Sequence, residues 1–256
     1  MADPAREVLI AGAMDDNHCA GLDEVETALR FPVSINTESG FVGRPGTQIY
    51  ASDEQVLKIK TEYSLECDAA WQWASKQLQQ EREWGIYAPG RTWLVLRTNT
   101  GCALANITPR METLDQVLKT PGRDSTEKVE LLQSLVRFYF RFYKKFQLRQ
   151  DEGLTNYGVQ ESRIYYLDDD IYGTDNLIAF AHSLATWLRM MEFLAPTGAY
   201  MVGKTVREEA DGEGVETDGS GLPDMERRVL ASEMEGSVAH SRGLGLWAVT
   251  WLVRRI

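Results

Sequence analysis

The sequence has few cysteines and histidines, and neither kind is arranged as a metal site. Its three cysteines, Cys19, Cys67 and Cys102, lie far apart without a CxxC pair, and its three histidines are isolated from one another. Zinc sites need closely spaced pairs of such ligands, so a zinc knuckle is excluded. A disulfide framework is not expected either, and we interpret the cysteines as buried or idle thiols.

Basic residues are outnumbered and long apolar runs are missing. The 256 residues include 38 acidic and 27 basic side chains, which gives a formal net charge of −11. A surface of this sign repels phosphate backbones, so nucleic acid is not an expected partner unless the arginines cluster. No window approaches about 18 apolar residues, and the N-terminus lacks the pattern of a signal peptide, so we expect no membrane span and a cytoplasmic location.

What is present indicates a globular chain that mixes helices and strands. Hydrophobic residues make up 43% of the sequence, which is enough for a sizeable core. Thr113 is expected to cap a short helix that begins at LDQVL. Apolar periodicity predicts helices at about 65–82, 114–118, 125–147 and 179–194, and strands at 55–60 and 92–98.

Changes in composition divide the chain into three segments. Residues 1–33 combine an apolar run with a short helical pattern, and we interpret them as an N-terminal extension with a peripheral strand and helix. Residues 34–194 form the main unit. Residues 195–256 are charged and glycine-rich before an apolar finish, GLGLWAVTWLVRRI. This composition predicts a linker or an exposed loop region.

A glycine-rich stretch precedes a strand that carries two lysines. Gly40, Gly43 and Gly46 lie in GFVGRPGTQIY, and glycine lets a backbone approach a ligand closely. The next strand, VLKIK, offers Lys58 or Lys60 as a phosphate-binding cation, and the apolar residues before it favour Lys58. Taken alone, the glycines fit an ordinary hairpin loop better, and a strand lysine is commonly a solvated edge residue.

Two acidic motifs follow further along the chain. DEGLTN places Asp151 five residues before Asn156, and RIYYLDDD places Asp168 at the end of an apolar strand. Carboxylate and amide oxygens bind Mg²⁺, and a carboxylate can accept the proton of an attacking hydroxyl. The first spacing alone arises by chance in an acidic chain, and the run of three aspartates also fits a solvated turn. The order of all these motifs is what favours a phosphotransferase site.

That order resembles the protein-kinase-like superfamily, which includes protein kinases and aminoglycoside-type phosphotransferases. The resemblance covers about residues 34–194. It implies an α+β fold with two lobes, in which a small antiparallel sheet with one helix is followed by a mainly helical lobe, and ATP and Mg²⁺ bind between them. It also implies that the glycine-rich stretch covers the nucleotide phosphates.

The resemblance assigns a role to each polar residue. Lys58 binds the phosphates, Asp151 accepts the proton of the acceptor hydroxyl, and Asn156 and Asp168 hold magnesium. Glu66 is chosen to hold the lysine. The other carboxylates that the next helix offers for this task are Glu81 and Glu83.

The motifs also depart from the family pattern, so an inactive pseudokinase is an open alternative. Arg149-Gln150 stands where protein kinases have His-Arg, and Asp169-Asp170 replaces Phe-Gly. The acceptor substrate is not readable from the sequence.

The end of the chain resembles the ATP-binding part of sensor histidine kinases. Gly219 and Gly221 match a D-x-G-x-G box, and Gly243 and Gly245 match a second box that contacts the triphosphate through backbone N–H groups. Thr217 stands where the adenine-reading Asp belongs, so the resemblance implies a degenerate, truncated α/β tail. The alternative function is a non-catalytic signalling or regulatory protein that binds a protein partner through this tail. A buried terminal helix is the third interpretation.

Overall fold

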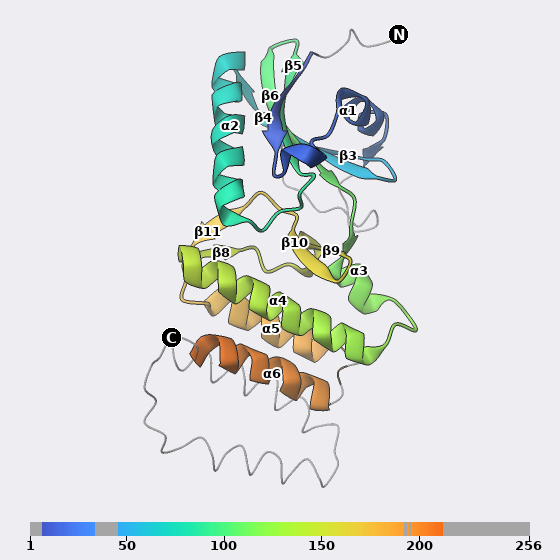
Figure 1. Ribbon diagram of the computed structural model, residues 1–256, viewed down its shortest axis with the longest axis vertical. Helices are drawn as coiled ribbons and strands as arrows, with labels where there is room; N and C mark the ends of the chain where they lie inside the picture. Colours follow the sequence, from blue (N-terminus) through green and yellow to red (C-terminus); the bar gives the residue numbers. More distant parts are fainter. Residues whose placement is uncertain (1–6, 34–45, 192–193, 195, 212–256) are drawn as a thin grey trace. The chain divides into compact units, whose positions relative to one another are not determined.

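The computed structural model describes residues 7–33, 46–191, 194 and 196–211 (Figure 1). The chain forms two compact units. The first unit runs to Glu112 and includes Tyr165–Leu167, while the second comprises Thr113–Ile164 and the residues from Asp168 onward.

The first unit is built on a six-stranded antiparallel sheet (Figure 1). Its strand order is β1-β5-β6-β4-β3-β2. Three consecutive strands, β2, β3 and β4, therefore form a meander, and the β5–β6 hairpin joins it by pairing β6 with β4. The strands are β1 Val8–Ala13, β2 Pro32–Val33, β3 Thr47–Ala51, β4 Gln55–Leu65, β5 Thr92–Thr98 and β6 Gly101–Pro109.

Helices cover both faces of this sheet. Because side chains alternate along a strand, Leu57 and Ile59 of β4 share one face and the two lysines of β4 share the other. Helix α1, Leu22–Ala28, packs Val25 on the first face. Helix α2, Cys67–Trp84, packs Ala70, Ala74 and Leu78 on the second face, against Trp93, Val95 and Leu104. Segment 8–33 therefore belongs to the sheet, because β1 is an edge strand and α1 covers a face.

A disulfide joins α2 to the sheet, contrary to the sequence-based interpretation of idle thiols. Cys67, the first residue of α2, is bonded to Cys102 of β6. The pairing of β4 with β6 shifts register after Lys60 and places Leu65 opposite Cys102, so the chain that enters α2 lies beside that cysteine. Cys19 is the free and exposed cysteine in the described part of the chain.

The second unit is mainly helical. Its long helix α4 packs against α6 and against the strand that follows α4. Tyr139 and Phe140 of α4 contact Phe180 of α5 through their rings. The helices are α3 Leu114–Lys119, α4 Ser125–Phe146, α5 Ile178–Met190 and α6 Pro196–Asp211. The short elements of this unit are β8 Leu148–Gln150, η2 Leu154–Asn156, β9 Tyr157–Gln160 and β11 Ile171–Gly173. Strands β7 Glu112–Thr113 and β10 Arg163–Tyr166 each have residues in both units, and η1 Asp16–His18 belongs to the first unit.

The predicted α+β class is confirmed, with an antiparallel sheet in one unit and helices dominating the other. Thr113 caps α3 as expected, because Gln116 N donates to its hydroxyl. The segment from residue 195 begins differently from the prediction of a linker or loop. Residues 196–211 form α6, in which Ala199, Val202 and Val206 are buried at helical spacing. None of the described helices is both long and apolar enough to cross a membrane.

Candidate functional site

Lys58 is the β4 lysine that reaches the chain before Asp168. Its ammonium Nζ donates to the carbonyl of Leu167 at 2.9 Å, and both residues belong to the first unit. Leu167 directly precedes Asp168 in sequence. Lys60 lies two residues further along the same face and takes a different place, with Nζ 5.8 Å from the centre of the Trp93 ring. The geometry thus separates the two lysines that the sequence left as candidates.

In the second unit, Asp151 and Asn156 lie around Gly153. A Cβ placed on Gly153 would stand 3.0 Å from Asn156 Nδ2 and 3.4 Å from Asp151 Oδ1. The carboxylate also accepts a hydrogen bond from Gly153 N at 3.0 Å, which forms a tight turn before η2. The Asp151 carboxylate and the Asn156 carboxamide, which begin and end the DxxxxN motif, are therefore close to each other.

A two-stranded ribbon brings the aspartate run to the same place in the second unit. Strands β8 and β11 are antiparallel, and Gln150 is opposite Ile171. Asp151 follows Gln150, and Asp170 precedes Ile171. Because paired antiparallel strands leave these two residues at the same end of the ribbon, the turn around Gly153 and the run that begins at Asp168 share that end.

Buried polar contacts fix the residue next to Asp151. Glu152 is 6% exposed and accepts a 2.7 Å hydrogen bond from the Tyr139 hydroxyl of α4. Arg149 donates to the same carboxylate at 3.1 Å and lies 3.5 Å from Asp175. Burial raises the pKa of Glu152, although Tyr139 and Arg149 favour its charged form. Burial, reinforced by the Glu152 charge, also raises the pKa of Tyr139, so this phenol is a hydrogen-bond donor.

The remaining predicted residues have varied positions. Glu66 is the N-cap residue of α2, and its predicted role beside Lys58 stays a prediction. Gly46 has φ +89°, and a Cβ there would lie 2.8 Å from Glu62 Cβ, so the turn before β3 needs glycine. The predicted phosphate-contacting glycines outside the described residues are Gly40, Gly43, Gly219, Gly221, Gly243 and Gly245.

The sequence analysis missed a buried ion pair in the first unit. Glu81 of α2 and Arg91 before β5 are both fully buried, with Arg91 Nε 2.8 Å and Nη2 2.9 Å from the carboxylate. The Trp93 indole donates to the same carboxylate at 2.8 Å. Glu81 lies in the polar run QQEREW, which looks solvent-exposed. The available signal was its spacing from Ala74 and Leu78, which places it on the buried face of α2.

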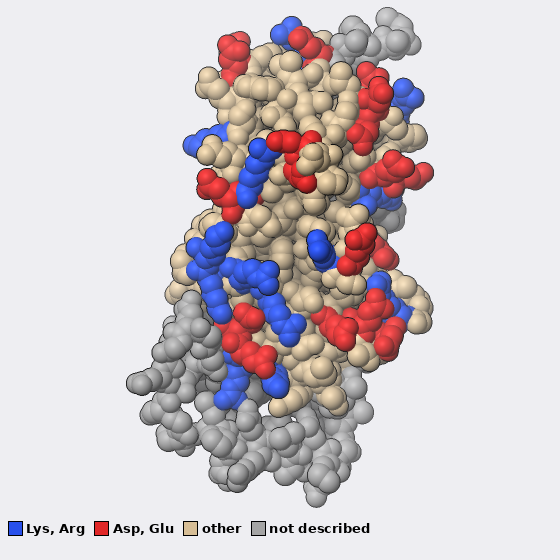
Figure 2. Space-filling view, in the orientation of Figure 1, with Lys and Arg blue, Asp and Glu red and all other residues tan. Residues whose placement is uncertain are grey.

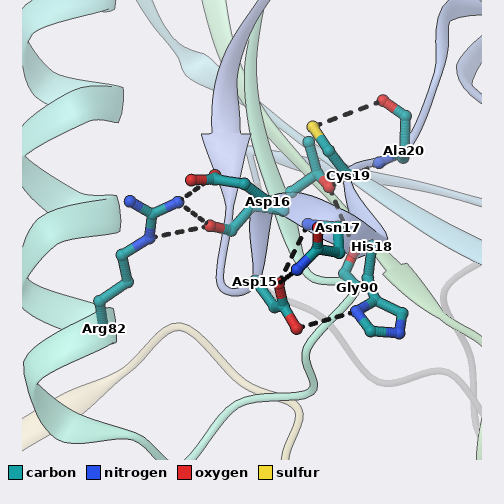
Figure 3. A network of polar contacts seen from close by, with 10 residues as sticks. Asp15, Asp16, Asn17, His18, Cys19, Ala20, Arg82 and Gly90 are labelled. Carbon is teal, nitrogen blue, oxygen red and sulfur yellow. Dashed lines mark hydrogen bonds and ion pairs between the residues drawn. The ribbon is translucent and has the colours of Figure 1, made fainter.

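An exposed polar cluster near η1 has a structural role (Figure 3). Arg82 of α2 donates to the Ala13 carbonyl and to Asp16, which holds the end of α2 to β1. Asp15 accepts from Asn17 and lies 3.0 Å from His18 Nδ1. The hydrogen bond from the Asn17 backbone is the main cause that lowers the pKa of Asp15. The contacts of Asp15 are local and exposed, so they stabilise the turn.

Acidic residues line a hollow of about 150 Å³ between α1 and the β3–β4 turn. Three carboxylates would repel a phosphate group, so the hollow does not suit a nucleotide. Gln55 Nε2 donates to Glu24 there at 3.0 Å, which closes part of the lining. The lining residues are Asp23, Glu24, Thr27, Ser52, Glu54 and Gln55.

Basic side chains gather over α4, as Figure 2 shows in the part of the view where Figure 1 draws that helix. Arg137, Arg141 and Lys145 are exposed and four residues apart, so they form one row along the helix. Lys145 Nζ lies 4.7 Å from the centre of the Phe146 ring. Elsewhere in this view acidic and basic side chains are interspersed.

Asn156 and Asp168 are the residues that the sequence predicts to hold magnesium. Within the described residues, no three His, Cys, Asp or Glu side chains are grouped so that they could hold a metal ion by themselves. Mg²⁺ commonly takes one or two carboxylates and completes its shell with water and substrate phosphates. Asp168 with the carboxamide of Asn156 would supply the protein ligands of such a site.

Comparisons with known proteins give distant structural likenesses but no match in sequence. No family model matches the sequence, and no curated protein matches it. Among solved structures, the bifunctional kinase-methyltransferase WbdD is similar over 73% of this chain, with 12% identity and a TM-score of 0.38. This chain spans 47% of that protein.

Proposed function

We propose that the chain binds ATP with Mg²⁺ and transfers the γ-phosphoryl group to a hydroxyl acceptor. The observation that carries this proposal is the 2.9 Å hydrogen bond from Lys58 Nζ to Leu167 O. It joins residues 109 positions apart, and it fixes the strand lysine beside the chain that leads into Asp168. The carbonyl that Lys58 binds directly precedes Asp168 in the chain, and a lysine ammonium and an aspartate carboxylate are the groups that bind a phosphate and its metal ion in phosphotransferases.

Asp151, Asn156 and Asp168 of the second unit have separate roles in this reaction. Asp151 accepts the proton as the acceptor oxygen bonds to the γ-phosphorus, and the bond between that phosphorus and the β–γ bridging oxygen breaks to release ADP. Mg²⁺ would neutralise charge on the phosphates, with Asn156 and Asp168 as its protein ligands. The contacts of Glu152 with Tyr139 and Arg149 keep the adjoining loop in place.

The strand order of the first unit supports the same proposal. A meander, a helix and a hairpin follow one another, and the lysine-bearing strand β4 lies inside the sheet between β3 and β6. An interior strand holds its side chains more firmly than a solvated edge strand, because both of its edges are hydrogen-bonded. Lys58 is therefore well placed to keep a fixed position.

A thermal-shift titration with ATP and Mg²⁺ tests the proposal. Wild-type protein at ATP one hundred times its dissociation constant should gain about 2.7 kcal/mol in unfolding free energy. Lys58→Met should abolish the gain, whereas the matched variant Lys60→Met should retain it because Lys60 lies over the Trp93 ring. The same contrast is expected between Asp168→Asn and Asp169→Asn.

Two outcomes would contradict the proposal. Stabilisation that survives Lys58→Met and Asp168→Asn but disappears in Gly245→Ala would place the nucleotide in the C-terminal segment. No stabilisation of the wild type by ATP with either Mg²⁺ or Mn²⁺ would favour a non-catalytic regulatory protein.

A further inference from the structure

The loop that follows α2 holds the segment Tyr165–Leu167. Tyr166 N donates to the carbonyl of Ile86 at 2.8 Å. The ring of Tyr166 also packs against the ring of Tyr87, with centroids 5.9 Å apart and planes inclined by 52°. Both tyrosines are buried, at 0% and 4% exposure. The loop therefore contacts the segment through its backbone and through a side chain.

Tyr87 is held in turn by the buried ion pair. The guanidinium carbon of Arg91 lies 4.4 Å from the centre of the Tyr87 ring and 5.5 Å from that of Trp93. Glu81 binds the same guanidinium through both carboxylate oxygens. A planar guanidinium can bind a carboxylate along its edge and stack on a ring with its face, and lysine cannot do both.

A buried ion pair of this kind fixes the orientation of its side chains more than it adds net stability. The attraction between two buried charges does little more than offset the cost of removing them from water. Apolar residues of similar volume can therefore often replace such a pair without loss of stability. A bidentate pair does fix the orientation of the guanidinium, and Trp93 satisfies the same carboxylate. Glu81 thus sets the plane on which Tyr87 rests.

We propose that Arg91 and Tyr87 are positioning residues for Asp168. Arg91, oriented by Glu81, fixes the Tyr87 ring, and that ring fixes Tyr166 so that the chain enters Asp168 from a constant backbone position. Because Asp168 is a metal ligand only in the function proposed above, the inference rests on that function. Neither Arg91 nor Tyr87 touches the substrate in this arrangement.

Three variants separate positioning from simple loss of stability. Tyr87→Leu removes the ring and keeps an apolar side chain, whereas Tyr87→Phe keeps the ring and should behave as wild type. Val25→Ala is the destabilising control, since Val25 belongs to α1 and is fully buried against the other face of the sheet. Arg91→Lys keeps the positive charge but loses the stacking plane, so it should resemble Tyr87→Leu.

Amide hydrogen exchange is the first measurement and needs no ligand. In Tyr87→Leu, exchange of peptides covering residues 85–91 and 163–167 should accelerate about tenfold, as expected for the loss of an aromatic pair and a cation–π contact. Val25→Ala should instead accelerate exchange throughout the sheet. Unchanged exchange at 163–167 in Tyr87→Leu, or acceleration as uniform as in Val25→Ala, would overturn the inference.

The magnesium requirement is the second measurement. The Mg²⁺ concentration that gives half of the ATP-dependent stabilisation should rise about tenfold in Tyr87→Leu and return to the wild-type value in Tyr87→Phe. Affinity for ATP at saturating Mg²⁺ should change little. An equal loss in Val25→Ala would overturn the positioning role. A wild type that binds no ATP would defeat the proposed function, while the exchange result would still decide whether the loop holds the segment.

Discussion

The hydroxyl of Tyr139 donates a 2.7 Å hydrogen bond to the carboxylate of Glu152, one residue after Asp151. Burial raises the pKa of that carboxyl above its ordinary value of 4.5. The native state therefore binds more protons than the unfolded chain, and this group contributes stability that is present below pH 4.5 and lost as pH rises through the folded-state pKa. Relative to Glu152→Gln, the wild type should lose unfolding free energy as pH increases.

Urea unfolding at several values between about pH 4 and pH 8 measures this difference. Glu127→Gln is the control with the opposite sign, because Arg123 lowers the pKa of Glu127 and the contribution of that carboxylate is lost as pH falls. The difference in unfolding free energy between wild type and each variant should therefore change with pH in opposite directions. A change in the same direction for both variants would contradict the raised pKa of Glu152.

Gly153→Ala should impair the candidate site without unfolding the chain. The backbone of Gly153 has φ −62° and ψ 126°, which alanine adopts readily, so the loss of stability should be small. Its Cβ would, however, lie 3.0 Å from Asn156 Nδ2 and displace that side chain. We expect the affinity for ATP in the presence of Mg²⁺, measured by calorimetry, to be at least roughly tenfold lower than in the wild type. A displaced Asn156 side chain would hold the metal ion poorly.

Gly173→Ala is a matched control for this substitution, since a Cβ on Gly173 meets nothing within 4 Å. Both variants should show the same midpoint of thermal unfolding within about 2 °C. Equal ATP binding by Gly153→Ala and wild type would show that Asn156 is not a ligand.

Reduction of the disulfide between Cys67 and Cys102 should destabilise the first unit. The bond closes a loop across a sequence separation of 35, and the chain-entropy estimate for a loop of that size is about 3 to 4 kcal/mol. Unfolding with and without a reducing agent, combined with peptide mapping of the non-reduced protein, measures the effect. Cys19→Ser should show the same difference in unfolding free energy with and without the reducing agent. A double variant, Cys67→Ser with Cys102→Ser, that is as stable as the wild type would refute the prediction.

Removal of the cap of α3 should cost about 1 kcal/mol. Thr113 and Gln116 bind each other reciprocally, with Thr113 N 2.9 Å from Gln116 Oε1 and Gln116 N 3.3 Å from Thr113 Oγ1. Thr113→Ala loses the hydroxyl, whereas Thr113→Ser keeps it. Chemical denaturation of both should show the loss in the alanine variant alone, and an equal loss in both would assign the effect to the methyl group.

Local patterns in the sequence were sufficient to predict helices α2 to α5 and strands β4 and β5. The apolar spacing of α2 and α4 matches their buried faces, and the hydroxyl of Thr113 caps α3. Helix α6 was missed because Pro196 and Gly198 open it and a charged stretch closes it, which hid the spacing of its buried residues.

Contacts between distant residues were harder to predict. Asp151 and Asn156 lie near each other because both flank the turn at Gly153, while their roles stay a prediction. Cys67 and Cys102 gave no signal, since their pairing depends on a register shift between β4 and β6. The pairing of Glu81 with Arg91 was not predicted either, because charged residues are rarely buried unless paired and each partner alone looks like a surface residue.

The edge position of β1 matters to anyone who would express only the region that resembles a kinase. A protein beginning at residue 34 would leave the N–H and C=O groups of β5 open along one side and would uncover Leu57, Ile59 and Leu94, which α1 now shields together with β1. An unpaired strand beside bare apolar surface is a template for pairing between molecules. Such a shortened protein should precipitate or form fibres, so residues 8–33 have to be kept to cover this edge and this face of the sheet.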